Sequence, residues 1–372
     1  MRFKKKVSVS VILLIFFSRT TSLIVERGTG ANFPHRSDAT TFAHHADRIS
    51  GQLVTGEFTL YLSNYTGGTN EMWPFLLSPF WLLPGPSQLY ATVFLIIIST
   101  IAVYNVYVIA QYYHSHTAGV FAILPIALMP NYVVVHASLL RDGVVLFCLI
   151  AAVRYLAIPD RPMIRRVAYS GLLLAFSIDL RDYNLFVITP TVGVLVIFYL
   201  YSNDGKERVA SILTMLLSIV AILYSKSIRE FIEAEAISVA GRRSYGARGR
   251  TAYLPEPIPE SLLEVLQLSP VTTIYFLYTP FPWMIEHVFD LVGFIESTIY
   301  LFYTILMLYG VRYMLQKNHW VTLGIILGFI LGIVMWGLGS ANVGQAARHR
   351  QMFVWVICLF GGIGLAHLVN LK

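Results

Sequence analysis

Apolar residues occur in long blocks along the whole chain, and short polar stretches separate the blocks. A helix needs roughly 20 apolar residues to cross the hydrocarbon core of a bilayer. Blocks that approach this length without a central charge predict about ten transmembrane helices. The expected fold is an all-α, polytopic transmembrane bundle that forms a single membrane domain over residues 1–372. The blocks are residues 7–24, 88–110, 118–136, 143–157, 167–181, 185–201, 209–225, 288–310, 320–339 and 351–369.

The first block allows two interpretations. Lys4, Lys5 and Lys6 precede an apolar run of signal-peptide length, but no clear cleavage site of small residues follows it. We therefore favour a transmembrane helix over a signal peptide. The Lys and Arg residues of the short loops then lie mostly on the side of the N-terminus. The positive-inside rule predicts a multi-pass protein of the plasma (cytoplasmic) membrane with both termini inside.

The composition agrees with a membrane protein and limits the classes of partner that are expected for it. Hydrophobic residues make up 56% of the chain and charged residues 13%, whereas soluble domains have about 25% charged residues. The net charge is +7, but the basic residues form no continuous stripe. Membrane lipids and phosphate-bearing substrates are therefore expected as partners, and nucleic acid is not. Cys148 and Cys358 lie inside apolar blocks and indicate neither disulfides nor a zinc site.

Two long segments, residues 25–87 and 226–287, are expected on the outer side, where they carry short interfacial helices. In the first, residues 38–48 have the pattern of an amphipathic helix that lies on the membrane. Asp38 is either a capping residue of this helix, accepting backbone N–H groups, or a general base that receives the proton of an acceptor hydroxyl. Asp47 is the competing carboxylate on the same helix.

The second outer segment combines an arginine-rich stretch with an apolar one. Residues 241–250 contain four arginines, among them Arg242 and Arg243, and three glycines. Because the arginine fork matches phosphate oxygens, this stretch is either a lid over a phosphorylated substrate or a solvated loop. Residues 261–283 predict an interfacial or re-entrant helix pair, because Glu264 and three prolines interrupt an otherwise apolar run.

Further arginines stand at helix edges that face outward in this topology. They are Arg141 beside Asp142, Arg181 beside Asp182, and Arg348 with Arg350. Arginine in short outer loops opposes the positive-inside tendency, so a function other than orientation is expected for some of them. We predict that Arg348 and Arg350, with Arg141, Arg181, Arg242 and Arg243, bind a substrate phosphate. Asp142 and Asp182 are secondary candidates, and the alternative is that adjacent Arg and Asp neutralise each other or partner another helix end.

Three stretches resemble the GT-C class of membrane glycosyltransferases, especially the protein-mannosyltransferase-like and aminoarabinose-transferase-like enzymes. They are Asp38-Ala39 followed by Phe42, Ala43 and Ala46; Pro130-Asn131 followed by residues 138–142; and residues 342–353 before the last block. The resemblance implies transfer of a sugar from a polyprenyl-phosphate-linked donor to a glycan, lipid or protein acceptor at the extracytoplasmic face. It also implies that Asp38 activates the acceptor. The loop lacks the second acidic residue of many members, so no cofactor is expected while a divalent metal stays open.

Two other functions fit parts of the sequence. The block Pro280-Phe281-Pro282-Trp283 and the outer arginines are similar to features of polymerases that join lipid-linked oligosaccharide repeats. Such an enzyme would tolerate Asp38→Asn. A non-enzymatic lipid or solute transporter is the third possibility, because Pro125, Pro130 and Pro190 could break helices near the middle of the membrane.

Overall fold

The computed structural model describes residues 8–29, 36–56, 69–181, 237–238, 241, 243, 247, 249–254, 259 and 261–369. Within these ranges the regular structure is helical, and one isolated antiparallel bridge joins Ala252 to Asn342. The prediction of an all-α fold is therefore confirmed. The chain divides into two compact units. Unit 1 comprises Met1–Asn184, Leu306–Gly310 and Cys358–Lys372, and unit 2 comprises Leu185–Ile305 and Val311–Ile357.

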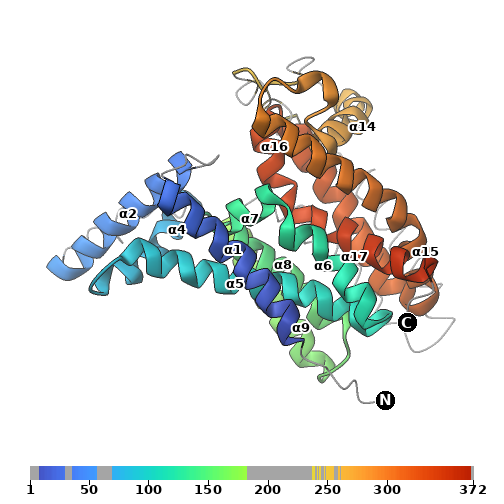
Figure 1. Cartoon of the computed structure of the whole chain (residues 1–372), viewed down its shortest axis with the longest axis horizontal. Coiled ribbons are helices and arrows are strands. Elements are labelled where there is room, and N and C mark those ends of the chain that lie inside the picture. Colours follow the sequence, from blue (N-terminus) through green and yellow to red (C-terminus); the bar gives the residue numbers. More distant parts are fainter. Residues whose placement is uncertain are drawn as a thin grey trace. The chain divides into compact units, whose positions relative to one another are not determined.

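Unit 1 is built around one long helix, α5 (Figure 1). Its elements are α1 (Val9–Thr29), α2 (Arg36–Thr55), α4 (Thr69–Leu77), the 3-10 helix η1 (Ser78–Leu82), α5 (Ser87–Tyr113), α6 (His116–Leu128), α7 (Pro130–His136), α8 (Asp142–Ala157) and α9 (Met163–Leu180). Helix α5 packs against α1, α6 and α8, and every side chain from Ala102 to Ala110 is buried. A helix that is apolar on all sides belongs in a core, which explains the central place of α5 in the unit.

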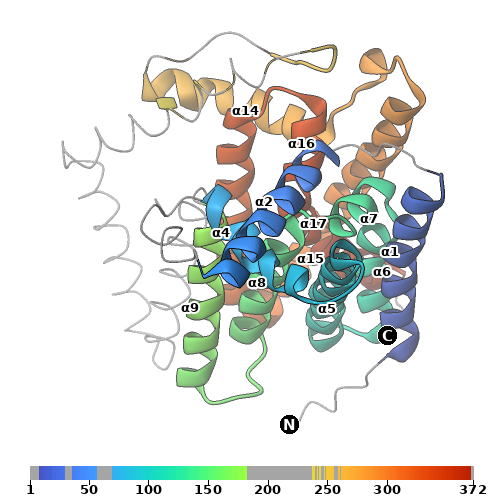
Figure 2. The same ribbon diagram turned by 90° about the vertical axis from the view of Figure 1, so that its left-hand side faces the viewer.

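In unit 2, one helix lies across the end of a long helix that is divided into two arms. Its elements are α14 (Leu262–Tyr278), the 3-10 helix η2 (Pro282–Met284), most of α15 (Val288–Gly339), α16 (Val343–His349) and the start of α17 (Gln351–Leu368). Figure 2 shows α14 running across the end of the unit where α16 lies, and these two helices are in contact. Over residues 261–283, for which an interfacial or re-entrant helix pair was predicted, the structure has one helix and a single 3-10 turn. The placement of this segment at the membrane surface stays a prediction.

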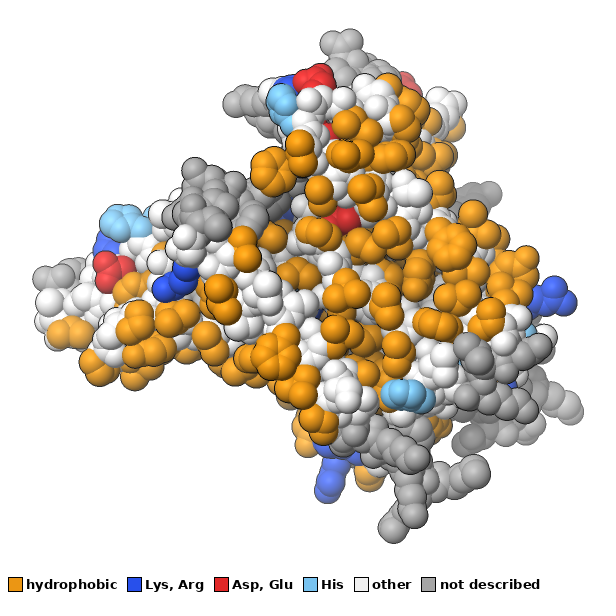
Figure 3. All heavy atoms as spheres, in the orientation of Figure 1, with side chains coloured by type: hydrophobic (Ala, Val, Ile, Leu, Met, Phe, Trp, Pro, Cys, Tyr) orange, Lys and Arg blue, Asp and Glu red, His pale blue; other side chains and the backbone are white. Residues whose placement is uncertain are grey.

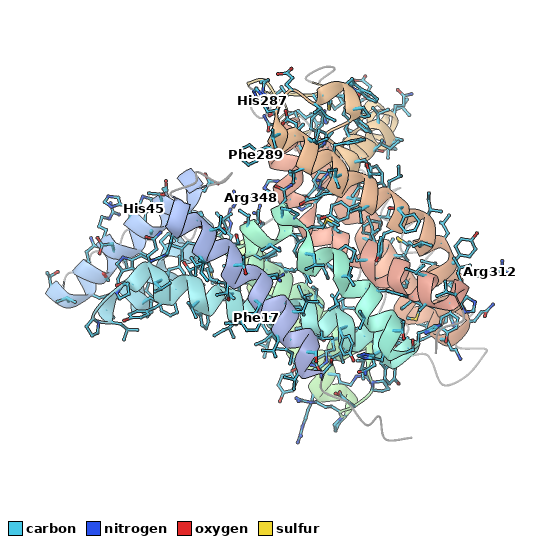
Figure 4. The ribbon with its side chains drawn as sticks, viewed as in Figure 1. Phe17, His45, His287, Phe289, Arg312 and Arg348 are labelled. Carbon is cyan, nitrogen blue, oxygen red and sulfur yellow. The ribbon has the colours of Figure 1, made fainter. Side chains whose placement is uncertain are left out.

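Helix α15 is too long for one passage through a membrane. It has 52 residues, or roughly 78 Å at the rise of an α-helix, whereas the hydrocarbon core is roughly 30 Å thick. Asn318 has non-helical backbone angles and divides α15 into two arms. The two predicted spans 288–310 and 320–339 therefore fall one in each arm. Figure 4 shows Arg312 at the opposite end of the first arm from His287.

Four described helices are long and apolar enough to cross a membrane, and the bent pair α6 and α7 makes a fifth if it is counted as one span. The four are α1, α5, α15 and α17. Helix α8 has 16 residues, and the charges of α9 include Arg165 and Arg166. The predicted spans 185–201 and 209–225 lie outside the described residues. A membrane-spanning protein is thus supported, while the count of about ten spans and the orientation of the termini stay predictions.

The outer face of the first arm of α15 is largely apolar, with Thr298 as an exposed polar residue near its middle. Its exposed residues recur every three or four positions, and Figure 3 shows hydrophobic side chains covering this surface. They include Val288, Leu291, Ile295, Phe302, Ile305 and Tyr309. Soluble monomers rarely expose an apolar stripe this long, so lipid tails are its natural solvent.

Glycines allow α15 and α17 to approach closely within unit 1. A Cβ atom on Gly310 would overlap the backbone of Phe360, and one on Gly364 would overlap the backbone of Leu306. Close contact through small residues is the usual way in which membrane helices associate, because lipid removes the hydrophobic driving force between them.

Helix α2 confirms the predicted amphipathic helix and extends it. Ala39, Ala46 and Ile49 are buried on one side, while Asp38 and Asp47 are exposed on the other. The helix begins at Arg36. Asp38 therefore lies in the first helical turn, rather than at the position before the helix that the capping interpretation assigned to it.

Candidate functional site

Buried arginines gather at the α14–α16 end of unit 2, and Arg243 is the one whose three nitrogens all donate hydrogen bonds. Its Nε and Nη2 donate to the carbonyl oxygen of Leu254 at 2.9 and 2.8 Å, and its Nη1 donates to that of Gly337 at 3.2 Å. Gly337 is in the last turn of α15, where carbonyl groups lack helical partners. Burial lowers the pKa of Arg243. This guanidinium therefore joins the 253–254 segment to the end of α15, a structural role that the sequence did not suggest.

Arg350 is also buried, at 1% exposure, but one of its nitrogens remains available. Nη1 donates to the carbonyl oxygens of Leu277 and Thr279 at 3.0 and 2.5 Å and to Ser297 Oγ at 3.0 Å. The guanidinium lies over the ring of Tyr300, 5.3 Å from its centroid. Nη2 has no hydrogen-bond partner within the described structure. A buried donor of this kind is rare in native proteins and points to water or a ligand.

Arg348 and Arg250 complete the basic group. Arg348 is buried on α16 (Figure 4), a helix whose start is capped by Asn342 Oδ1 accepting from Gly344 N at 2.8 Å. Arg250 is exposed, and it forms ion pairs with Asp290 at 2.8 Å and with Glu286 at 3.3 Å. The hydrogen bond to Asp290 raises the pKa of Arg250. Asp290 is therefore committed to Arg250 at the N-terminus of α15.

Hydroxyl groups without partners lie at the same end of unit 2. The side-chain oxygens of Tyr253, Thr273, Thr279 and Ser340 are buried and make no hydrogen bond among the described residues. Burial raises the pKa of Tyr253, so its hydroxyl remains a donor. Thr279 adjoins Arg350 through its carbonyl oxygen, and the backbone N–H of Tyr253 donates to Ala341 next to Ser340. One guanidinium nitrogen and several hydroxyls at one helix junction suit the oxygens of a phosphate or a sugar.

An aromatic series connects this junction with the surface of unit 2. Ring centroids are separated by 5.4 Å from Tyr253 to Tyr275, 5.0 Å from Tyr275 to Phe281, and 4.8 Å from Phe281 to Trp283. Exposure rises from 3% at Tyr253 to 71% at Trp283. We call these four residues the aromatic ladder. Exposed Trp is typical of the head-group level of a membrane, so the ladder is suited to an amphiphilic substrate.

Unit 1 holds a separate group of ionisable residues. Arg181 Nη2 lies 2.5 Å from Asp142 Oδ1, and both side chains are buried. Asp142 opens α8, where a negative charge is favoured by the helix dipole, and Arg181 follows the end of α9. Asp142 is thus paired not with its neighbour Arg141 but with a residue 39 positions away at the end of another helix, which is one of the alternatives that the sequence left open. Arg141 itself is half-buried at the start of α8.

Two residues of this unit were not singled out from the sequence, Arg19 and His136. Arg19 is completely buried on α1, and it donates to Ser99 Oγ at 2.9 Å and to the carbonyl oxygens of Ile15 and Ile126. His136 is 1% exposed, and neither of its ring nitrogens has a partner among the described residues. The sequence feature that could have identified Arg19 is its charge inside the predicted span 7–24, because charged residues within a membrane are costly and usually functional.

The remaining predicted residues lie elsewhere. Asp38 and Asp47 are exposed on α2, and His45 of the same helix projects outward in Figure 4. Arg242 and Asp182 fall outside the described residues. In the described ranges, no group of three or more His, Cys, Asp or Glu side chains could hold a metal ion.

Comparisons with known proteins add no assignment. No protein-family model matches the sequence, and no curated protein is significantly similar to it. The function is therefore inferred from the chemistry of the two groups of ionisable residues, one in each unit. In unit 2 that chemistry is cationic, rich in hydroxyl donors and adjacent to an exposed apolar surface.

Proposed function

We propose that the protein is a membrane glycosyltransferase that transfers a sugar from a polyprenyl-phosphate-linked donor to an acceptor at the extracytoplasmic face. The supporting observation is the combination, at one end of unit 2, of buried arginines with the aromatic ladder and the lipid-facing stripe of α15. A polyprenyl phosphate has the matching parts, an anionic head and an apolar tail.

Arginine would act on the leaving group in this reaction. The acceptor oxygen attacks the anomeric carbon, the bond from that carbon to the phosphate oxygen breaks, and the electron pair leaves with the phosphate. Donors aimed at the departing charge lower the barrier. Arg348 and the free Nη2 of Arg350 are assigned this role, with Arg242 as a further candidate. Arg141 and Arg181 belong to unit 1, where Arg181 is already paired with Asp142, and they are not assigned to it. Arg243 is assigned to holding the 253–254 segment in place.

Asp38 is assigned the proton of the acceptor hydroxyl. It lies in the first turn of α2 and is exposed. An exposed carboxylate is accessible to an acceptor from the aqueous side. Asp47, exposed nine residues later on the same helix, provides a matched comparison.

The test uses purified protein in lipid nanodiscs with radiolabelled polyprenyl-phosphate sugars. Arg348→Ala is expected to lower the transfer rate by about 100-fold, the usual effect of removing one donor to a developing negative charge. Arg312→Ala, at the other end of the first arm of α15 (Figure 4), and Asp47→Asn serve as controls and should retain wild-type rates. Equal rates for Arg348→Ala and Arg312→Ala in folded protein would remove the basis of the proposal.

A polymerase of lipid-linked oligosaccharide repeats is the second candidate. The stacked pair of Phe281 and Trp283, with an interplanar angle of 8°, favours it, because stacked aromatic rings also bind sugars of a growing chain. Asp38→Asn separates the two functions. The transferase should lose most of its activity with this substitution, while the polymerase should keep it and should extend oligosaccharide-linked donors rather than monosaccharide-linked ones.

A further inference from the structure

His136 is a buried polar group for which the fold provides no hydrogen bond. It ends α7, it is 1% exposed, and its ring lies 4.6 Å from the ring of Tyr132. Both ring nitrogens lack a partner among the described residues. A neutral imidazole has one N–H donor and one acceptor nitrogen. In an apolar bundle these atoms normally find a protein group, a water molecule or a ligand.

The surroundings of His136 carry positive charge. Arg19 Nε donates to Ser99 Oγ, and the same hydroxyl donates to the carbonyl oxygen of His136 at 3.4 Å. The other two hydrogen bonds of Arg19 are to carbonyl oxygens. The hydrogen-bond acceptors of Arg19 in the described structure are therefore all neutral. The nearby carboxylate of Asp142 is already paired with Arg181. Buried charges are normally paired with an opposite charge, and an anion would complete this group.

Helices of unit 1 bend or begin close to His136 in the chain. Helices α6 and α7 are bent by 74° at their junction, and α8 begins at Asp142. With 16 residues, α8 is roughly 24 Å long. A helix of this length that reaches one membrane surface therefore begins inside the hydrocarbon core, which is roughly 30 Å thick. A Cβ on Gly143, in its first turn, would lie 3.3 Å from His136 Nδ1. The N-terminus of α8, which already carries the carboxylate of Asp142, thus adjoins His136.

We propose that His136 and Arg19 form an anion site inside the membrane-spanning part of unit 1, and that its ligand is a phosphate group. An N–H of His136 donates to an anionic oxygen, and the charge of Arg19 balances the ligand. The phosphate belongs either to a lipid head group or to a free ion. This site consists of different residues from the arginine group of unit 2 and does not depend on the proposed transfer reaction.

The direct test measures the distance from His136 to phosphorus in the full-length protein. Protein with 15N-labelled histidine is reconstituted with polyprenyl phosphate, and 15N–31P dipolar dephasing is recorded by solid-state NMR. His136→Gln identifies the signal by its loss. Dephasing of the His136 ring nitrogens is expected, and no dephasing, as for a site that holds only water, would refute the proposal. Repeating the experiment with inorganic phosphate in phosphate-free, neutral lipid distinguishes a free ion from a lipid head group.

A second measurement separates binding from folding. His136→Phe removes the polar atoms but keeps a ring of similar size, so the thermal midpoint should stay constant or rise. Phosphate-dependent stabilisation of the protein should fall at least 10-fold in apparent affinity. His116→Phe is the matched control, because His116 Nδ1 pairs with the Tyr107 hydroxyl at 2.6 Å. It should lose stability and keep the affinity. Wild-type affinity in His136→Phe would contradict the site.

Discussion

Buried arginines are held in two different ways, and the difference indicates which of them are available to a substrate. In unit 1, Arg181 is paired with the carboxylate of Asp142, whereas Arg19 donates only to neutral oxygens. In unit 2, Arg243 and Arg350 donate to carbonyl and hydroxyl oxygens, and Arg350 keeps one free nitrogen. A paired guanidinium has little left to offer an anion, whereas one that is bound to neutral oxygens still carries a charge that needs a partner. Burial alone therefore does not identify a substrate-binding arginine.

The largest expected effect concerns the ion pair of unit 1. Asp142→Asn leaves the buried charge of Arg181 without its partner, and such changes cost about 3–5 kcal/mol. Thermal unfolding in detergent should show a large loss of stability. The double variant Asp142→Leu, Arg181→Met should recover most of it, because replacement of both charges by apolar groups is often neutral. Equal losses in the single and double variants would mean that the pair has a different role.

The next effect concerns the glycine contact between α15 and α17. Gly364→Val places a side chain against the backbone of Leu306, and overpacking of this kind costs about 1–3 kcal/mol. The midpoint of thermal unfolding should fall accordingly. Gly171→Val is the control, because a Cβ at Gly171 meets no atom within 4 Å. A similar shift for the two variants would argue against the close contact.

A smaller effect is expected at the exposed end of the aromatic ladder. Trp283→Ala removes a ring stacked on Phe281, an interaction of about 0.5–1.5 kcal/mol. It should raise the KM for a polyprenyl-phosphate donor several-fold and leave kcat largely unchanged. Phe289→Ala is the control, because Phe289 is about as exposed as Trp283 and forms no part of the ladder. An identical KM change in both variants would indicate a general membrane effect.

The smallest effect is predicted for Arg250. Arg250 and Glu286 are exposed, whereas Asp290 is buried and also accepts from the backbone N–H groups of Glu286 and His287. Ion pairs made by an exposed side chain contribute about 0–1 kcal/mol. Arg250→Gln should therefore change thermal stability little, and the difference from wild type should shrink further in high salt. A loss as large as that of Asp142→Asn would show that Arg250 supports the end of α15 in another way.

Helical structure was predictable from the sequence because it follows from local patterns. Apolar blocks located α5 and both arms of α15, and the charge pattern of residues 38–48 located α2. The break at Asn318 also has a local cause, since Lys317 and Asn318 interrupt the apolar run. These features need only neighbouring residues to determine them.

The site could be predicted only in part, because its contacts join distant residues. Nothing local indicates that Asp142 pairs with Arg181 rather than with Arg141. Arg243 lies in a stretch rich in glycine and arginine that is typical of a solvated loop, yet it is completely buried by contacts with the end of α15. Arg348 on α16 and Arg350 at the C-cap of this helix were anticipated only as a cluster of basic residues. Which nitrogen of Arg350 remains free depends on packing.

Photo-crosslinking shows whether the arginine end of unit 2 binds the phosphate of a lipid-linked sugar. A polyprenyl-phosphate sugar with a diazirine in the isoprene unit next to the phosphate is activated in nanodiscs, and the labelled peptides are identified by mass spectrometry. We expect labels within residues 250–254, 275–284 and 340–350, which unlabelled donor abolishes. Competable labelling confined to the opposite end of the first arm of α15, around Arg312, would contradict it.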